Sequence, residues 1–131
     1  MIRIVLIDDS TTFLAIASRF LSKHEDLKVV GAVSEGRLAV EASTALQPDI
    51  VLVDLAMPDM SGMEVISLLR QAMPNVGIIA LTFLEEEKYH DAVLSIGADA
   101  FVAKEDLTLK LVPTILNVAY MRGHRMQVSF A

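Results

Sequence analysis

The chain has 131 residues, of which 53% are hydrophobic, and this size and composition are typical of one compact domain with a substantial core. Its formal net charge of -6 argues against direct nucleic-acid binding, because contacts to phosphate backbones require clustered Lys and Arg. The absence of cysteine excludes disulfides, thiolate metal sites and a cysteine nucleophile, and it suits a cytoplasmic location. Polar residues interrupt every apolar stretch before it reaches the length of a bilayer, so we expect a soluble, cytoplasmic protein without membrane association.

The amino-terminal half alternates short β-branched runs with segments of helical period. An apolar run at residues 4–7, closed by two acids, predicts the first strand, and residues 29–33 and 50–53 predict the next two. A helix is expected after each strand, because apolar residues recur there at the spacing of one helical face. These faces comprise Phe13, Ile16, Ala17 and Phe20 in the first helix, Leu38, Ala42 and Ala45 in the second, and Gly62, Val65, Ile66 and Leu69 in the third, which Pro74 stops.

The carboxyl-terminal half repeats this pattern twice. Residues 78–81 and 100–103 predict the fourth and fifth strands. The fourth helix is expected to begin near Glu85 and the fifth to end at Gly123. The apolar faces comprise Tyr89, Ala92, Val93 and Ile96 in the fourth helix and Val112, Ile115, Leu116 and Ala119 in the fifth.

The strands are almost continuously apolar, which indicates burial on both faces, and their alternation with helices indicates right-handed crossovers. The sequence therefore predicts an α/β fold, a (βα)5 three-layer sandwich around a five-stranded parallel sheet. We expect one domain over residues 1–123, and we interpret residues 124–131, which lose clear periodicity, as a tail or the start of a linker.

Polar residues follow four of the predicted strands at their carboxyl ends. They are Asp8 and Asp9 after the first strand, Asp54 after the third, Thr82 at the end of the fourth and Lys104 after the fifth. Ligands of open parallel sheets bind at this edge, so we expect the five side chains to converge on one site.

Three neighbouring carboxylates repel one another unless a cation neutralises them, and hard oxygen ligands suit Mg²⁺. Asp54 could then attack phosphorus as a carboxylate nucleophile, while Lys104 and Thr82 contact the phosphoryl oxygens. Each residue also has an ordinary structural interpretation. An acid after the first strand could cap a helix, Asp54 could belong to a turn before Pro58, Thr82 could cap the next helix, and Lys104 could be a solvated charge. The coincidence of all of them at strand ends favours one functional site.

Four segments carry a resemblance to a known family. They are residues 7–10 (Ile-Asp-Asp-Ser), 54–62 (Asp-Leu-Ala-Met-Pro-Asp-Met-Ser-Gly), 81–82 (Leu-Thr) and 97–104 (Gly-Ala-Asp-Ala-Phe-Val-Ala-Lys). With them the chain resembles the receiver domain of two-component response regulators from Ile4 to about Met121. This resemblance implies a flavodoxin-like fold with strand order 2-1-3-4-5.

The resemblance also implies a mechanism. A sensor histidine kinase would supply the phosphoryl group to Asp54, and Asp8, Asp9, Asp54 and the backbone carbonyl of Ala56 would hold Mg²⁺. The chain would be a signalling switch that assists its own phosphorylation and dephosphorylation, rather than an enzyme acting on other molecules. An inward movement of Thr82 would open space for the ring of Phe101, although Phe101 could equally be an ordinary core aromatic. The surface of the fourth helix, fifth strand and fifth helix would then meet an output domain or a second copy of the chain.

Two features depart from the common family pattern. Phe83 stands where the family usually has a small residue, which predicts a gated approach to Asp54 or a partner surface. Glu105 and Asp106 follow Lys104 where a proline is common, and this feature and residues 26–31 look like regulators with a LuxR-type helix-turn-helix output.

Two further function classes stay open at this point. A hydrolase with an aspartyl-phosphate intermediate is disfavoured by Ala56, which occupies the usual place of a general acid, and a receiver that works without phosphorylation is kept open by Phe83.

Overall fold

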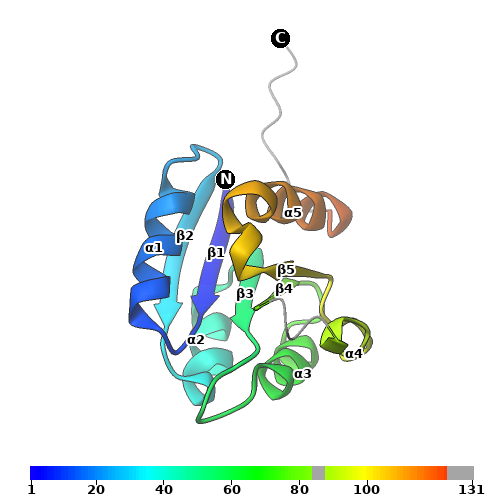
Figure 1. Cartoon of the computed structure of the whole chain (residues 1–131). Helices are drawn as coiled ribbons and strands as arrows, with labels where there is room; N and C mark the ends of the chain where they lie inside the picture. Colours follow the sequence, from blue (N-terminus) through cyan, green and yellow to red (C-terminus); the bar gives the residue numbers. More distant parts are fainter. Residues whose placement is uncertain (84–87, 124–131) are drawn as a thin grey trace.

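A five-stranded parallel sheet lies between two layers of helices in the computed structural model, which describes residues 1–83 and 88–123 (Figure 1). The strand order is β2-β1-β3-β4-β5, so the predicted flavodoxin-like (βα)5 fold is confirmed. Within the described part of the chain, no helix is long and apolar enough to span a membrane. The elements are β1 Ile2–Ile7, α1 Thr11–Ser22, β2 Leu27–Val33, α2 Ala39–Leu46, β3 Ile50–Asp54, α3 Gly62–Ala72, β4 Gly77–Thr82, α4 His90–Ser95, β5 Ala100–Ala103 and α5 Leu107–Met121, with 3-10 turns at Gly36–Leu38 and Lys104–Asp106.

The two faces of the sheet bury separate apolar clusters, because neighbouring side chains of a strand point to opposite faces. Ile50 and Leu52 of β3 pack with α1 and α5, whereas Val51 and Val53 pack with α2, α3 and α4. All residues of β3 and β4 are buried, as the apolar strand pattern predicts. Since both faces of the strands are covered, ligands reach the sheet at the ends of its strands.

The predicted faces of α1 and α2 are wrong in part. In α1 the buried residues are Leu14, Ala17 and Leu21, and Ile16 is 57% exposed. This helix has apolar residues on several sides, so more than one stripe fits the helical period. In α2, Ala39 and Ser43 are buried, while Leu38 lies in the preceding 3-10 turn with 45% of its surface exposed. A small polar residue, which a search for apolar periodicity passes over, occupies the interior position.

The remaining helices agree better with their expected faces. All four residues expected in the face of α3 are buried. In α5, Ile115 and Ala119 are buried as expected, but Leu111 and Val118 complete the face, with Val112 and Leu116 half-buried. In α4, Val93 is buried while Tyr89, just before the helix, is 42% exposed. The start expected near Glu85 and the tail at 124–131 lie outside the described residues.

Local hydrogen bonds fix the loops that leave β1 and β3. The Ser10 hydroxyl accepts a hydrogen bond from the Phe13 amide (3.1 Å) and begins α1, and the Ser61 hydroxyl accepts one from the Glu64 amide (3.3 Å) and begins α3. Gly62 packs against the backbone of Asp54, where a Cβ atom would overlap the Asp54 carbonyl oxygen. The close approach of α3 to the end of β3 therefore requires glycine at this position.

Candidate functional site

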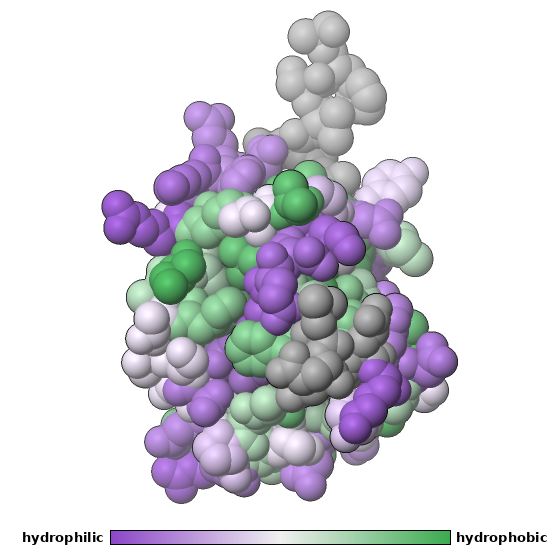
Figure 2. Space-filling view, viewed as in Figure 1, coloured by the Kyte–Doolittle hydropathy of each residue, from purple (hydrophilic) through white to green (hydrophobic). Residues whose placement is uncertain are grey.

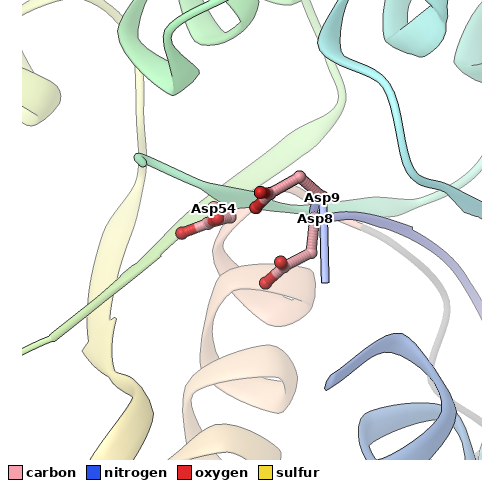
Figure 3. Close-up of side chains that lie close together, drawn as sticks. All are labelled: Asp8, Asp9 and Asp54. Atoms are coloured by element: carbon pink, nitrogen blue, oxygen red, sulfur yellow. The ribbon is translucent and has the colours of Figure 1, made fainter. Parts of the chain in front are cut away.

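Three carboxylates meet at the carboxyl ends of β1 and β3. Asp8 and Asp9 follow β1, Asp54 is the last residue of β3, and one oxygen of each lies within 4.8 Å of the others (Figure 3). Asp8 and Asp54 are almost fully buried, with 1% and 2% of their surface exposed, whereas Asp9 is exposed. The arrangement concentrates negative charge at a point that stays open to solvent on one side.

Lys104 supplies the positive charge that faces this cluster. It lies in the 3-10 turn after β5, and its Nζ atom is 2.8 Å from Asp8 Oδ2 and 3.4 Å from Asp54 Oδ1. The side chain is only 9% exposed, so solvent screens these ion pairs weakly. A single ammonium partly offsets the charge of three carboxylates.

Burial is the main cause of a raised pKa at Asp54, which reaches about 6 instead of 3.8. The neighbouring charge of Asp8 raises this pKa further, while the Lys104 ammonium and the Ala56 amide, which donates a 3.3 Å hydrogen bond to Asp54 Oδ1, lower it. The surroundings of Asp54 therefore destabilise its ionised form near neutral pH, and a divalent cation bound among the acids would stabilise that form.

The other residues expected at the site lie around this cluster. Thr82 is the last residue of β4 and is fully buried, and it pairs in register with Ala103, next to Lys104. Ala56 is exposed, two residues after Asp54. The structure thus pairs Lys104 directly with Asp8 and Asp54 and places Asp9 in the same cluster of carboxylates. Ala56 contacts Asp54 through its amide, and Thr82 lies at the same edge of the sheet.

Phe101 is half-buried on β5, and its ring stacks on that of His90 with 4.7 Å between centroids. It contacts the cluster between the sheet and α2, α3 and α4 without being enclosed by it. Local sequence patterns do not predict this contact with His90, because the two residues are 11 positions apart and come together only through the packing of α4 on β5.

An open cleft of about 530 Å³ leads from solvent to the carboxylates. Apolar residues from three parts of the chain line it, namely Phe13 and Ile16 of α1, Phe83 after β4 and Leu107 of α5. The Lys104 Nζ atom lies 4.4 Å from the centre of the Phe13 ring and 5.1 Å from that of Phe83. Sequence reasoning placed Phe13 in the core and missed this contact, because helical periodicity does not separate a cleft-lining ring from a core ring.

Asp59 is a second residue that sequence reasoning missed. Its two carboxylate oxygens accept hydrogen bonds from the amides of Gly36 (3.2 Å) and Arg37 (3.1 Å), and these contacts, that with Arg37 above all, lower its pKa. Asp59 thereby ties the loop after Asp54 to the turn that precedes α2.

The model of the response regulator receiver domain matches residues 4–115. The chain belongs to this family. Among curated proteins, the response regulator VraR of Staphylococcus epidermidis is 32% identical over 103 residues, and that of Staphylococcus saprophyticus is 33% identical over 104. Each match covers 79% of this chain but 49% of the relative, so the chain spans about half the length of these relatives.

Solved receivers share the fold over almost the whole chain. The response regulator domain of Thermotoga maritima CheB has a TM-score of 0.84 and 27% identity, over 92% of this chain and 97% of that one. The receiver domain of NarL from Mycobacterium tuberculosis has a TM-score of 0.83 and 28% identity, over 91% and 96%. A LuxR-family regulator from Aurantimonas has a TM-score of 0.86 and 25% identity, over 95% and 88%, which is consistent with the resemblance to the LuxR-type branch. The chain is therefore a receiver domain of two-component signal transduction, a family of signalling switches whose general role is to be phosphorylated by histidine kinases.

Proposed function

We propose that this receiver accepts a phosphoryl group on Asp54 from a sensor histidine kinase in a Mg²⁺-dependent reaction. One observation carries the proposal: the carboxylates of Asp8, Asp9 and Asp54 lie within 4.8 Å of one another, and the Lys104 ammonium is paired with both buried acids. Asp54 offers a nucleophilic oxygen, and Lys104 lies where it can balance charge on the transferred group.

The donor set fits Mg²⁺. It consists of hard carboxylate oxygens, one of them on the exposed Asp9, which leaves room for water in the coordination sphere. We assign Asp8, Asp9, Asp54 and the backbone carbonyl of Ala56 as its protein ligands. When bound, Mg²⁺ would neutralise charge on the carboxylates and on the phosphoryl oxygens.

Asp54, Lys104 and Thr82 have separate roles in the transfer of the phosphoryl group. An oxygen of Asp54 forms the new bond to phosphorus while the bond from phosphorus to the donor breaks, and the electron pair of that bond leaves with the donor. Lys104 binds a phosphoryl oxygen through its ammonium, and the Thr82 hydroxyl donates to another. The chain in this way assists its own phosphorylation.

The signal passes from Thr82 to Phe101 and from there to the surface of α4, β5 and α5. A movement of Thr82 toward the phosphoryl group would free space for the Phe101 ring, which would leave its stack on His90. The altered surface would contact an output domain of the LuxR type or a second copy of the chain. We place this switch in the cytoplasm, as one domain over residues 1–123.

Mg²⁺ is expected to raise the midpoint of thermal unfolding, because a ligand that binds only the folded state stabilises it by mass action. At a concentration 100 times the dissociation constant the gain is about 2.7 kcal/mol. A melting series in MgCl₂ measures the effect, with NaCl of equal ionic strength as the control. Equal midpoints in the two salts would contradict the metal assignment.

Phe83→Ala is expected to speed labelling of Asp54 by acetyl phosphate several-fold. The Phe83 ring lines the cleft and is 46% exposed, so its removal widens the approach to the acceptor. Mass spectrometry of the intact chain over time gives the rate. Unchanged labelling with altered partner binding would assign Phe83 to a partner surface instead.

Slow loss of the phosphoryl group is the last part of this proposal. Ala56, which has no group to orient a water molecule, supports it. The side chain of Leu84, two residues after Thr82, likewise has no group that could orient water, and this residue lies outside the described part of the chain.

A further inference from the structure

The mouth of the cleft is apolar although its floor is acidic. We call the side chains of Phe13, Ile16, Phe83 and Leu107 the apolar mouth. Ile16 and Phe83 are 57% and 46% exposed, so apolar surface is presented to solvent beside the phosphoacceptor, next to the exposed acids Asp9 and Glu105 that line the same cleft. On the face that carries α1 and α5, hydrophobic residues lie among hydrophilic ones (Figure 2). An apolar lining with a few placed polar groups is typical of a small-molecule site.

The geometry of phosphoryl transfer directs the leaving group to this mouth. In-line attack places the leaving group on the side of phosphorus opposite the attacking oxygen. Asp54 lines the floor of the cleft and is 2% exposed, so a donor that reaches it through the cleft keeps its leaving group on the solvent side. Phe13 and Phe83 flank the Lys104 ammonium at 4.4 and 5.1 Å, which puts both rings next to the reacting atoms.

We propose that the apolar mouth makes this receiver selective for small phosphodonors with an apolar leaving group, such as acyl phosphates with a longer hydrocarbon chain. The proposal rests on Asp54 being the phosphoacceptor. The reaction forms a bond between an Asp54 oxygen and phosphorus and breaks the bond between phosphorus and the acyl oxygen, and the electron pair leaves with the carboxylate. The hydrocarbon chain of that carboxylate lies against the apolar mouth and is removed from water.

Acetyl, butyryl and hexanoyl phosphate test the proposal, because their leaving groups are carboxylates of nearly equal basicity that differ in apolar surface. A fully buried methylene group gains about four-fold in binding, and a half-exposed one about two-fold. We therefore expect the second-order rate constant of Asp54 labelling to rise about four-fold from acetyl to butyryl phosphate and more than about ten-fold to hexanoyl phosphate. Equal rate constants for the three donors would overturn the proposal.

Variants distinguish an effect of the apolar mouth from an effect of a general change in the structure of α1. Ile16→Ser, at an exposed position, and Phe13→Ala should reduce the hexanoyl to acetyl ratio to about two or three, since each removes apolar surface from the mouth. Phe20→Ala is the matched control, because it removes another half-buried ring of α1 that packs on the same core cluster but does not line the cleft. A ratio that stays high in Ile16→Ser, or that falls equally in Phe20→Ala, would overturn the proposal.

A binding measurement without phosphoryl transfer gives an independent readout. Hexylphosphonate and methylphosphonate cannot transfer their phosphorus, and methyl NMR signals of Ile16 and Leu107 report contact with the mouth. We expect hexylphosphonate to shift these signals at concentrations at least about ten-fold lower than methylphosphonate. Equal concentrations for the two phosphonates would contradict binding of the hydrocarbon chain at the apolar mouth. Failure of every donor to label Asp54 would instead contradict the phosphoacceptor assignment.

Discussion

Asp54→Asn is expected to abolish formation of the acyl phosphate and to stabilise the metal-free protein above about pH 6. The amide is not a comparable nucleophile, so no covalent phosphate should accumulate. The stability gain follows from the buried carboxyl, whose pKa is raised from 3.8 to about 6 by burial and by the charge of Asp8. Its ionisation costs the folded state up to about 3 kcal/mol, a cost that an uncharged amide avoids.

The direction of this pH dependence is fixed by the sign of the pKa shift. At a pH below 3.8 the carboxyl is protonated in both states and the variant should equal the parent. As the pH rises through about 6, the parent loses stability that the variant keeps. Urea unfolding between pH 4 and pH 8 without metal measures the difference, with the exposed Asp26→Asn as the control. A covalent phosphate on the variant, or a stability difference that does not change with pH, would contradict the assignment of Asp54.

Lys104→Met is expected to slow labelling of Asp54 by about 100-fold or more, which is the usual effect of removing one group that stabilises developing charge. The variant keeps a long side chain but removes the ammonium that lies 2.8 Å from Asp8 Oδ2 and 3.4 Å from Asp54 Oδ1. Because two buried acids lose their cation, the metal-free protein should also lose about 3 kcal/mol of unfolding free energy.

Mg²⁺ should recover more stability in Lys104→Met than in the parent, since it replaces the missing positive charge among the same carboxylates. Labelling kinetics and urea unfolding with and without Mg²⁺ measure the two effects. Lys110→Met is a suitable control, because its ammonium pairs with Asp106 near the protein surface and the residue does not line the cleft. A variant labelled as fast as the parent would remove Lys104 from the reaction.

The sheet and the cluster of acids could be predicted from the sequence because both follow from short-range patterns. Apolar runs mark buried parallel strands, and polar residues that follow such runs must meet at one edge of the sheet. Asp8, Asp54 and Lys104 were located in this way, and the structure brings them into contact. The roles of these residues in phosphoryl transfer stay predictions until they are tested by chemistry.

The details that the sequence could not supply depend on packing between distant segments. Ser43 is fully buried in α2 although it is polar, and Ile16 is exposed although it has the spacing of the core. The stack of His90 on Phe101 depends on how α4 packs against β5. The rings of Phe13 and Phe83 both contact the Lys104 ammonium although the two residues are 70 positions apart, and no local sequence pattern predicts such a contact.

The most direct test of the central claim is to locate the phosphoryl group on the chain. Incubation with acetyl phosphate and Mg²⁺, followed by borohydride reduction, converts a phosphorylated aspartate to homoserine, which tandem mass spectrometry assigns to one position. We expect homoserine at position 54 alone, and none when EDTA replaces Mg²⁺. Homoserine at another aspartate, or an unmodified Asp54 after prolonged incubation with donor and Mg²⁺, would contradict the account.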